Sequence, residues 1–97
     1  MSEDDLDRYE AELEFNLLQE YKSVAPLFRF AVETERRFYL ANRVEVDRLG
    51  PAERAGFRVS LHDAWVWDKY RSNRFVETAE ILTFQDVNIE QLPRREL

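Results

Sequence analysis

The chain has 97 residues, of which 44% are hydrophobic and 13% aromatic, and this content favours one folded domain over a disordered chain. It contains no cysteine, which excludes disulfide bonds, thiolate metal sites and a cysteine nucleophile, and favours a reducing cytoplasm as its location. The net charge of −6 is unevenly distributed, because residues 1–20 hold eight acids and one base, whereas residues 21–97 hold twelve acids and thirteen bases. The N-terminal segment should therefore repel phosphate backbones and attract a basic protein surface.

The first predicted element is a helix from about residue 3 to residue 23. Its apolar side chains recur every three or four positions, as on one face of an amphipathic helix: Leu6, Tyr9, Leu13, Leu17, Tyr21 and Val24. Ser2 is a suitable N-cap, and Pro26 ends the pattern because the residue before a proline avoids helical angles. Phe15 lies opposite this stripe and Leu18 lies between the two, so a second element or another protein is expected to cover that side.

After Pro26 the apolar residues alternate with polar ones, which is typical of β-strands. Polar turns and loops separate the predicted strands, which cover about residues 28–33, 38–47, 57–67 and 80–89. In the second strand Asn42 occupies an apolar position, and it is expected to mark a bulge or to bond a neighbouring backbone. In the third strand the alternation places Trp65 and Trp67 on the same face as Leu61.

These elements predict an α+β fold, in which the long N-terminal helix packs on an antiparallel meander sheet of three or four strands and covers one face of it. Residues 1–97 are expected to form a single domain, with the sheet at about 27–90 and a frayed tail at 92–97. The acidic N-terminus lacks the basic and apolar regions of a signal peptide, and no apolar run reaches the length of a membrane span. We therefore expect no association with membranes.

The sequence has no motif for nucleophilic catalysis, phosphate binding or metal coordination. His62 is the single histidine, and one histidine cannot build a zinc site without cysteines. Asp63, Asp68 and Asp86 could serve a metal-dependent nuclease only if at least two of them reach one cation. The sequence thus predicts no catalytic residue, no metal and no cofactor, with the nuclease kept as a second alternative.

Two segments carry residue types that are common at binding surfaces. On the helix, acids flank two apolar side chains, and these candidates are Glu12, Glu14, Phe15 and Leu18. In the stretch DAWVWDKYRSNRF, at residues 63–75, the candidates are aromatic or arginine residues: Trp65, Trp67, Tyr70, Arg71 and Arg74. This stretch is expected first to be a structural strand that packs under the helix, and second to be a recognition surface.

The helix candidates predict contact with a protein partner that is basic or that handles nucleic acid. A symmetric homodimer that buries Phe15 is another explanation for the same side chain. The aromatic and arginine candidates offer a nucleic-acid-binding surface as an alternative function, although the acidic helix argues against strong binding to nucleic acid.

Three blocks of the chain resemble a family of small actinobacterial proteins of uncharacterised function: VETERRFYLANRVEV at 32–46, DAWVWDKYR at 63–71 and LTFQDVNIEQL at 82–92. With DLDRYEAELEFNLLQEYK near the start, the resemblance covers nearly the whole chain. It implies a gene beside that of ribonuclease HII, and hence a cytoplasmic protein near nucleic-acid metabolism, but no catalytic residue. We therefore expect a small acidic protein that acts by interaction or regulation and is not an enzyme.

Overall fold

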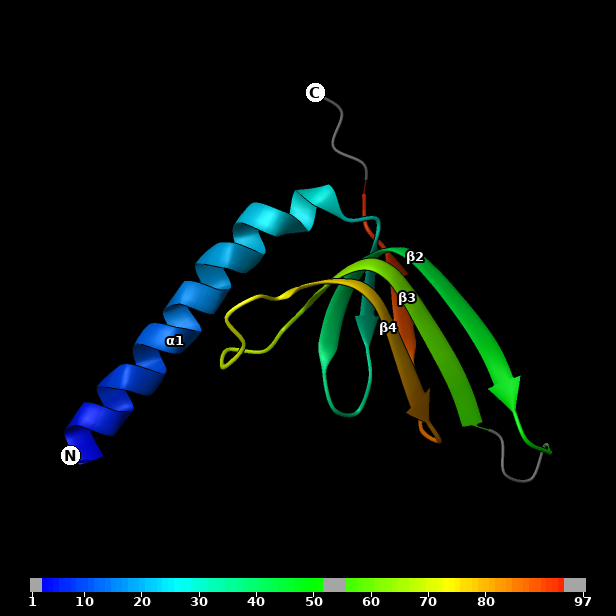
Figure 1. Ribbon diagram of the computed structural model, residues 1–97, viewed down its shortest axis with the longest axis horizontal. Coiled ribbons are helices and arrows are strands. Elements are labelled where there is room, and N and C mark those ends of the chain that lie inside the picture. Colours follow the sequence, from blue (N-terminus) through cyan, green and yellow to red (C-terminus); the bar gives the residue numbers. More distant parts are fainter. Residues whose placement is uncertain (1–2, 52–55, 94–97) are drawn as a thin grey trace.

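The computed structural model describes residues 3–51 and 56–93, which form one long helix and one five-stranded sheet (Figure 1). The elements follow in the order α1 (Glu3–Val24), the short 3-10 helix η1 (Ala25–Leu27), β1 (Phe30–Glu33), β2 (Phe38–Leu49), β3 (Gly56–Val66), β4 (Phe75–Thr83) and β5 (Asn88–Gln91). Neighbouring strands are all antiparallel, in the sheet order β4-β3-β2-β1-β5. The predicted α+β class is confirmed.

The predicted number of three or four strands is wrong, because the last predicted strand is two strands. β4 begins at Phe75 and ends at Thr83, and after a turn β5 pairs with β1 at the other edge of the sheet. Polar side chains shape the backbone at both ends of β4. The Asn73 side chain accepts a hydrogen bond from the Phe75 N–H at 3.1 Å, and the Thr83 hydroxyl accepts one from the Gln85 N–H at 3.0 Å.

The strands β2, β3 and β4 bend sharply along one line across the sheet (Figure 1). At this line Asn42, Asp63 and Glu77 are missing from the ladder of paired residues, while the pairs on both sides keep one register. Asp63 has a φ of 54°, and its carboxylate accepts a hydrogen bond from the Asn42 side-chain amide at 2.7 Å. Aspartate is among the few residues that adopt this left-handed conformation at low cost. Asn42 was expected to mark a bulge or to bond a neighbouring backbone, and both expectations are wrong, because the register is the same on its two sides and its amide bonds the Asp63 side chain.

The sheet divides the core into two clusters, because chain neighbours such as Ala31 and Val32, or Leu40 and Ala41, belong to different ones. In the first, buried residues of the sheet and of the segment after α1 pack with the helix: Leu17, Val24, Phe28, Ala31, Leu40 and Trp65. We call this the helix-side cluster. The second, which we call the inner cluster, contains Val32, Ala41, Val59, Leu61 and Ala64. Leu61 and Trp65 were predicted on one face and lie in different clusters, because the left-handed backbone at Asp63 interrupts the alternation between them.

The sheet is curled, so that its two edge strands approach each other. Residues 84–87 alone connect the end of β4 to the start of β5, although three strands lie between these two in the sheet. In a flat sheet the edge strands would be about 19 Å apart, and a connection of this length spans at most about 17 Å. The Thr83 hydroxyl donates to the Glu35 carboxylate at 2.7 Å, which ties the end of β4 to the turn between β1 and β2.

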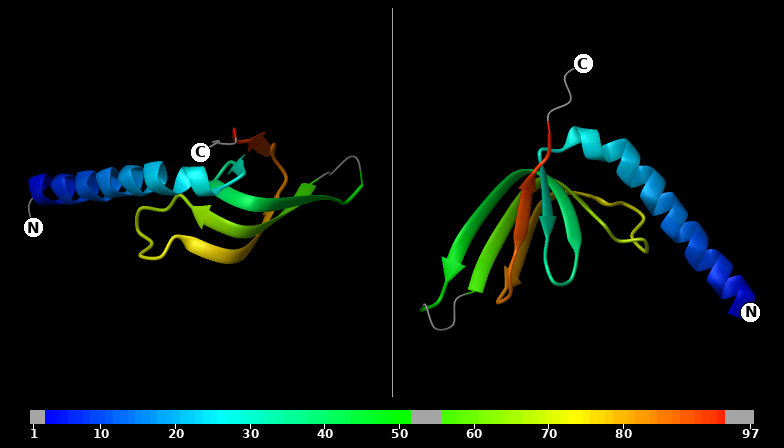
Figure 2. Two further views of the ribbon diagram at one scale, coloured as in Figure 1. Left: turned by 90° about the horizontal axis from the view of Figure 1, so that it is seen from above. Right: turned by 180° about the vertical axis from the view of Figure 1, so that it is seen from behind.

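The helix covers the sheet less fully than predicted. Leu17 and Val24 are buried in the helix-side cluster and Tyr21 packs against it, so the last two turns of α1 hold the helix on the sheet. The N-terminal part extends away from the sheet in every view (Figures 1 and 2), and Leu6 and Tyr9 of the predicted core stripe are 49% and 56% exposed. We call residues 3–16 the helical arm.

Leu92 was predicted to belong to a frayed tail, but it is packed and hydrogen-bonded. Leu92 packs against the helix-side cluster, and its N–H donates to the Arg29 carbonyl at 2.7 Å. Residues 94–97 and the predicted N-cap Ser2 lie outside the described residues. Across residues 3–51 and 56–93, no helix combines the length and the apolar character needed to cross a membrane.

Candidate interaction site between the helix and the β3–β4 loop

The β3–β4 loop (residues 67–74) turns back against the middle of α1 (Figure 1). The Trp67 N–H donates to the Phe38 carbonyl at 2.9 Å, which fixes the start of the loop on β2. One oxygen of Asp68 accepts a hydrogen bond from the Tyr70 N–H at 3.1 Å, and the other pairs with the Arg37 guanidinium at 2.9 Å. The loop is therefore held in place by hydrogen bonds, although it belongs to neither a helix nor a strand.

Glu20 joins the helix to the sheet and to the end of the loop. One of its oxygens accepts the indole N–H of Trp65 at 2.7 Å, and the other pairs with the guanidinium of Arg74. Arg74 also donates to the carbonyl oxygens of Asp68 and Lys69, at 2.9 and 3.4 Å. These contacts satisfy the indole N–H and the guanidinium, whose burial without hydrogen-bond partners would be unfavourable in free energy.

The burial of Trp65 and Arg74 corrects their predicted role. Both were candidates for a binding surface, but Trp65 is 0% exposed and Arg74 is 9% exposed, and the burial of Trp65 agrees with the expectation of a strand that packs under the helix. Trp65 packs with the helix through the helix-side cluster, and Arg74 points its charge at Glu20. In this conformation they stabilise the protein's own junction between helix and sheet, and a partner cannot reach them.

A second group of polar contacts connects the loop to the helical arm. Lys69 Nζ lies 2.7 Å from a Glu10 oxygen and 3.0 Å from a Glu14 oxygen, and the Tyr70 hydroxyl donates to Glu10 at 2.8 Å. The hydrogen bond from Lys69, followed by that from Tyr70, lowers the pKa of Glu10. The hydrogen bond to Glu10 is the main reason that the pKa of Lys69 and the pKa of Tyr70 are both raised.

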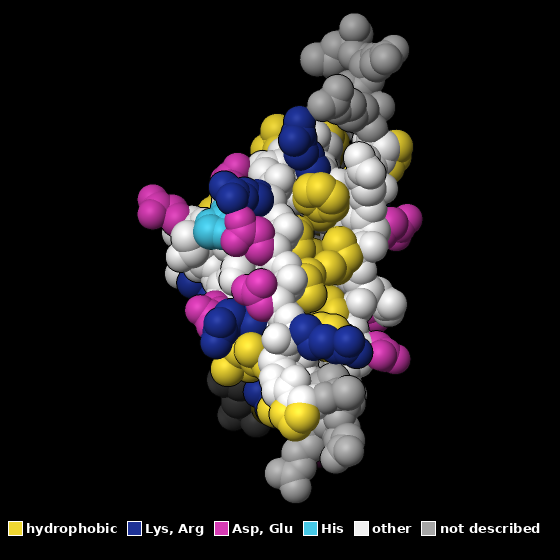
Figure 3. All heavy atoms as spheres, turned by 90° about the vertical axis from the view of Figure 1, so that its right-hand side faces the viewer, with side chains coloured by type: hydrophobic (Ala, Val, Ile, Leu, Met, Phe, Trp, Pro, Cys, Tyr) yellow, Lys and Arg dark blue, Asp and Glu magenta, His cyan; other side chains and the backbone are white. Residues whose placement is uncertain are grey.

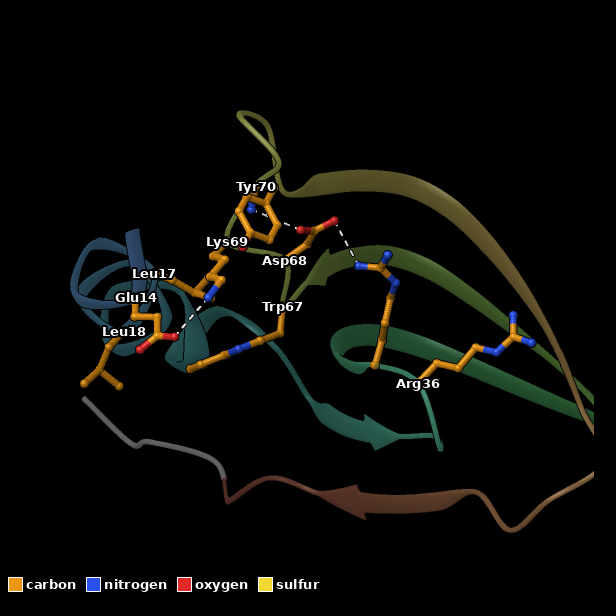
Figure 4. A pocket seen from close by; sticks show the side chains of 9 residues that line it. Glu14, Leu17, Leu18, Arg36, Trp67, Asp68, Lys69 and Tyr70 are labelled. Carbon is orange, nitrogen blue, oxygen red and sulfur yellow. Dashed lines mark hydrogen bonds and ion pairs between the residues drawn. The ribbon is translucent and has the colours of Figure 1, made fainter. Parts of the chain in front are cut away.

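A groove of about 750 Å³ opens between the helix and this loop (Figure 4). Leu18 and Trp67 are apolar side chains of its wall, and both are exposed. The charged side chains around them are mostly neutralised, because Lys69 pairs with Glu14 and Arg37 pairs with Asp68. The groove is therefore better suited to an apolar side chain of a protein than to a phosphate group.

Four predicted residues of the helix are exposed together on α1: Glu12, Glu14, Phe15 and Leu18. Phe15 is 62% exposed and lines a shallow depression of about 420 Å³ together with Arg8, Glu12 and other side chains of the helix. Leu6 and Tyr9 add apolar surface that the sequence reasoning assigned to the core. Their spacing indicated a buried stripe, and nothing in the sequence showed that the sheet ends before it reaches them.

The other predicted residues of the loop lie at the surface. Tyr70 and Arg71 are exposed, and Trp67 is partly exposed because its ring packs against Tyr21 and Trp65, with ring centroids 5.3 and 6.0 Å away. The two tryptophans do not form a common exposed surface, since one of them is buried.

The three aspartates of the nuclease alternative do not converge. Asp63 bonds Asn42 at the bend, Asp68 pairs with Arg37 in the β3–β4 loop, and Asp86 lies in the connection between β4 and β5. Within the described residues there is no group of three or more histidine, cysteine or acidic side chains that could hold a metal ion. The three aspartates lie in separate elements, so the structure gives the nuclease alternative no support.

Comparison with known proteins identifies the family. A family model described as "Protein of unknown function (DUF2469)" matches residues 1–97. The chain belongs to this family. Similar relatives include the uncharacterized proteins Rv2901c and MT2969 of Mycobacterium tuberculosis and Mb2925c of Mycobacterium bovis, each 50% identical over 97 residues that cover 100% of this chain and 96% of the relative. No solved structure matches the chain.

These matches agree with the resemblance to an uncharacterised actinobacterial family. The gene neighbourhood that the resemblance implies, beside ribonuclease HII, stays a prediction. The family description and the relatives name no activity, so function has to be argued from the chain itself.

Proposed function

We propose that this protein is a non-enzymatic interaction module whose helical arm binds a basic segment of another protein. The observation that supports this proposal is the exposure of large apolar side chains on a helix that extends beyond its own sheet: Leu6, Tyr9, Phe15 and Leu18. Most of the stability of a helix in a protein comes from packing of its apolar face against other elements. The arm has little such packing, and a bound partner would supply it.

The charge of the arm favours one kind of partner. Residues 3–16 contain seven acidic residues and the single base Arg8. Within the protein, Lys69 engages Glu10 and Glu14, and the exposed Glu12 lies beside Phe15 on the other side of the helix. A second arm would bring like charges together and a nucleic acid would bring phosphates, so both would be repelled, whereas lysine and arginine side chains of a partner would be attracted. A protein that handles nucleic acid commonly carries such a basic surface.

Binding of nucleic acid to the sheet has less support than binding of a protein to the arm. It was predicted from an aromatic and arginine surface, and the burial of Trp65 and Arg74 removes two members of that surface. Lys69 and Arg37, which border the remaining members, are paired with carboxylates. We therefore place the binding function on the arm and the adjacent groove, with Phe15 and Leu18 as apolar anchors.

The test compares capture of partners by the wild type and by two matched variants. Phe15→Glu changes the arm, and Leu82→Glu makes the same kind of change at an exposed leucine of β4. A lysate of an actinobacterium, with and without nuclease treatment, is passed over each immobilised protein, and a retained candidate is then purified and titrated against all three.

We expect the purified partner to carry a basic surface, to bind the wild type and Leu82→Glu equally, and to bind Phe15→Glu at least tenfold more weakly. Binding should also weaken as salt is raised, because charges contribute to it. Equal binding to all three proteins, or retention that disappears with the nuclease, would contradict the role of the arm.

A further inference from the structure

One edge of β2 is paired along only part of its length. β3 pairs with β2 from Tyr39 to Leu49, but β1 pairs with it only from Phe38 to Ala41. Beyond the bend, residues 43–49 therefore have one neighbouring strand within the described part of the chain. Their other edge presents backbone N–H and C=O groups without a partner strand, and such an edge is a template for pairing with another chain.

The side chains of this edge segment differ between its two faces. Arg43, Glu45 and Asp47 are exposed on one face, and Val44 and Val46 lie on the opposite face. Val44 packs against the inner cluster, and the exposed Val46 follows it on the same side. Figure 3, which looks at the side of the molecule where β2 lies outermost in Figure 1, shows charged side chains gathered beside a strip of hydrophobic ones.

We propose that a second copy of this chain pairs with the edge, β2 against β2 in antiparallel orientation, with the two-fold axis at Glu45. In this register each Arg43 lies opposite Asp47 of the other copy, and each Val44 lies opposite Val46. Symmetry repeats both pairs, so the interface contains two ion pairs on one face and two valine pairs on the other. The edge is thus complementary to itself in both charge and hydrophobicity.

The neighbouring registers are less favourable. A two-fold axis at Val46 would place Glu45 opposite Asp47, which repel each other. An axis at Val44 would place Arg43 opposite Glu45, which attract each other, but it would also place Val46 opposite Asn42, a polar residue that is missing from the ladder of paired residues. With the axis at Glu45 the two Glu45 side chains meet, but each already pairs with Arg43 of its own chain and lies 4.0 Å from its His62.

The acidic arm does not prevent this association. It extends from the opposite side of a molecule that is 51 Å long (Figure 1). Charges separated by much more than about 8–10 Å are largely screened at physiological salt. The proposed dimer therefore leaves the arm accessible, and it stands independently of the function proposed for the arm.

The test is the oligomeric state of the full chain by sedimentation at physiological salt, from about 1 to about 200 μM. We expect the wild type to approach twice the monomer mass as concentration rises. Val46→Lys and Arg43→Asp should each raise the dimer dissociation constant by about tenfold or more. The double variant Arg43→Asp/Asp47→Arg reverses both charges and should restore the wild-type constant to within about threefold. Leu82→Lys, at an exposed leucine outside this edge, serves as the control.

Circular dichroism confirms that each variant is folded before it is compared. A wild type that stays monomeric over the whole range would overturn the proposal. So would dimerisation of Val46→Lys with the wild-type constant, or a double charge reversal that fails to restore association. A dimer that Phe15→Glu abolishes and Val46→Lys leaves intact would place the interface on the arm and overturn it as well.

Discussion

The substitution Glu20→Ala tests whether a single carboxylate holds the helix on the sheet. It removes the acceptor of the Trp65 indole N–H and the partner of the Arg74 guanidinium. Trp65 is completely buried and Arg74 nearly so, which leaves both donors in sites that water hardly reaches. The last two turns of the helix should then lose their polar attachment to the sheet and keep only the packing of Leu17, Tyr21 and Val24.

The magnitude follows from the burial of the groups involved. A buried donor without an acceptor costs about 1–3 kcal/mol, and breaking a buried ion pair costs about 3–5 kcal/mol. The Glu20 side chain is 30% exposed and Arg74 keeps its hydrogen bonds to the carbonyl groups of Asp68 and Lys69, so the lower part of these ranges applies. We expect Glu20→Ala to lower the free energy of unfolding by about 2–4 kcal/mol.

Urea unfolding followed by tryptophan fluorescence and by circular dichroism measures this loss. Glu12→Ala is the matched control, because Glu12 is an exposed acid of the same helix, and its free energy of unfolding should change by less than about 0.5 kcal/mol. Glu20→Gln keeps an acceptor for the indole and should lie between the control and Glu20→Ala. If Glu20→Ala unfolds within about 0.5 kcal/mol of the wild type, the assignment of Glu20 as the attachment point is refuted.

Three further predictions address the bend, the arm and the close packing beside β4. Asp63→Val should lower the free energy of unfolding by about 2 kcal/mol or more in urea, because a β-branched residue resists the left-handed backbone, whereas Asp63→Gly should cost less than half as much. Because the pKa of Glu10 is lowered in the folded protein, its contacts stabilise the protein above about pH 4.5. This stability is lost as the pH falls through the folded-state pKa. The difference in urea midpoint between the wild type and Glu10→Gln should therefore vanish in acid. Gly56→Ala should destabilise by about 1 kcal/mol in the same assay, since the added methyl group would lie 3.0 Å from the Thr83 carbonyl oxygen, which cannot turn away as the exposed Phe84 ring can, and an unchanged midpoint would contradict this.

The helix shows that a local sequence pattern can predict the bounds of an element but not which part of it is buried. Its bounds were predicted to within a residue, because the 3.6-residue period and Pro26 act within the segment itself. The same pattern could not tell which half of the stripe is buried. Leu17 is enclosed and Leu6 is exposed, although both lie on one stripe, because burial depends on where the sheet lies in space.

The candidate site was predicted in its residue types and only partly in its geometry. Phe15 and the surrounding acids are on the surface of the helix, as their position opposite the apolar stripe indicated. Trp65 and Arg74 are buried, because they meet Glu20, which lies 45 and 54 residues away along the chain. No sequence spacing signals a contact of that kind.

The sequence by itself determined the α+β class, the N-terminal helix, the alternating strands and the concentration of negative charge at one end, because each depends on residues that are neighbours along the chain. The tertiary structure alone decided the fifth strand, the bend at Asp63, the burial of Trp65 and the partly unpaired edge of β2. The physical reason is that alternation specifies the two faces of a strand only while the backbone stays regular. A single residue with φ of 54° interrupts it, and the consequence appears only when distant segments pack together.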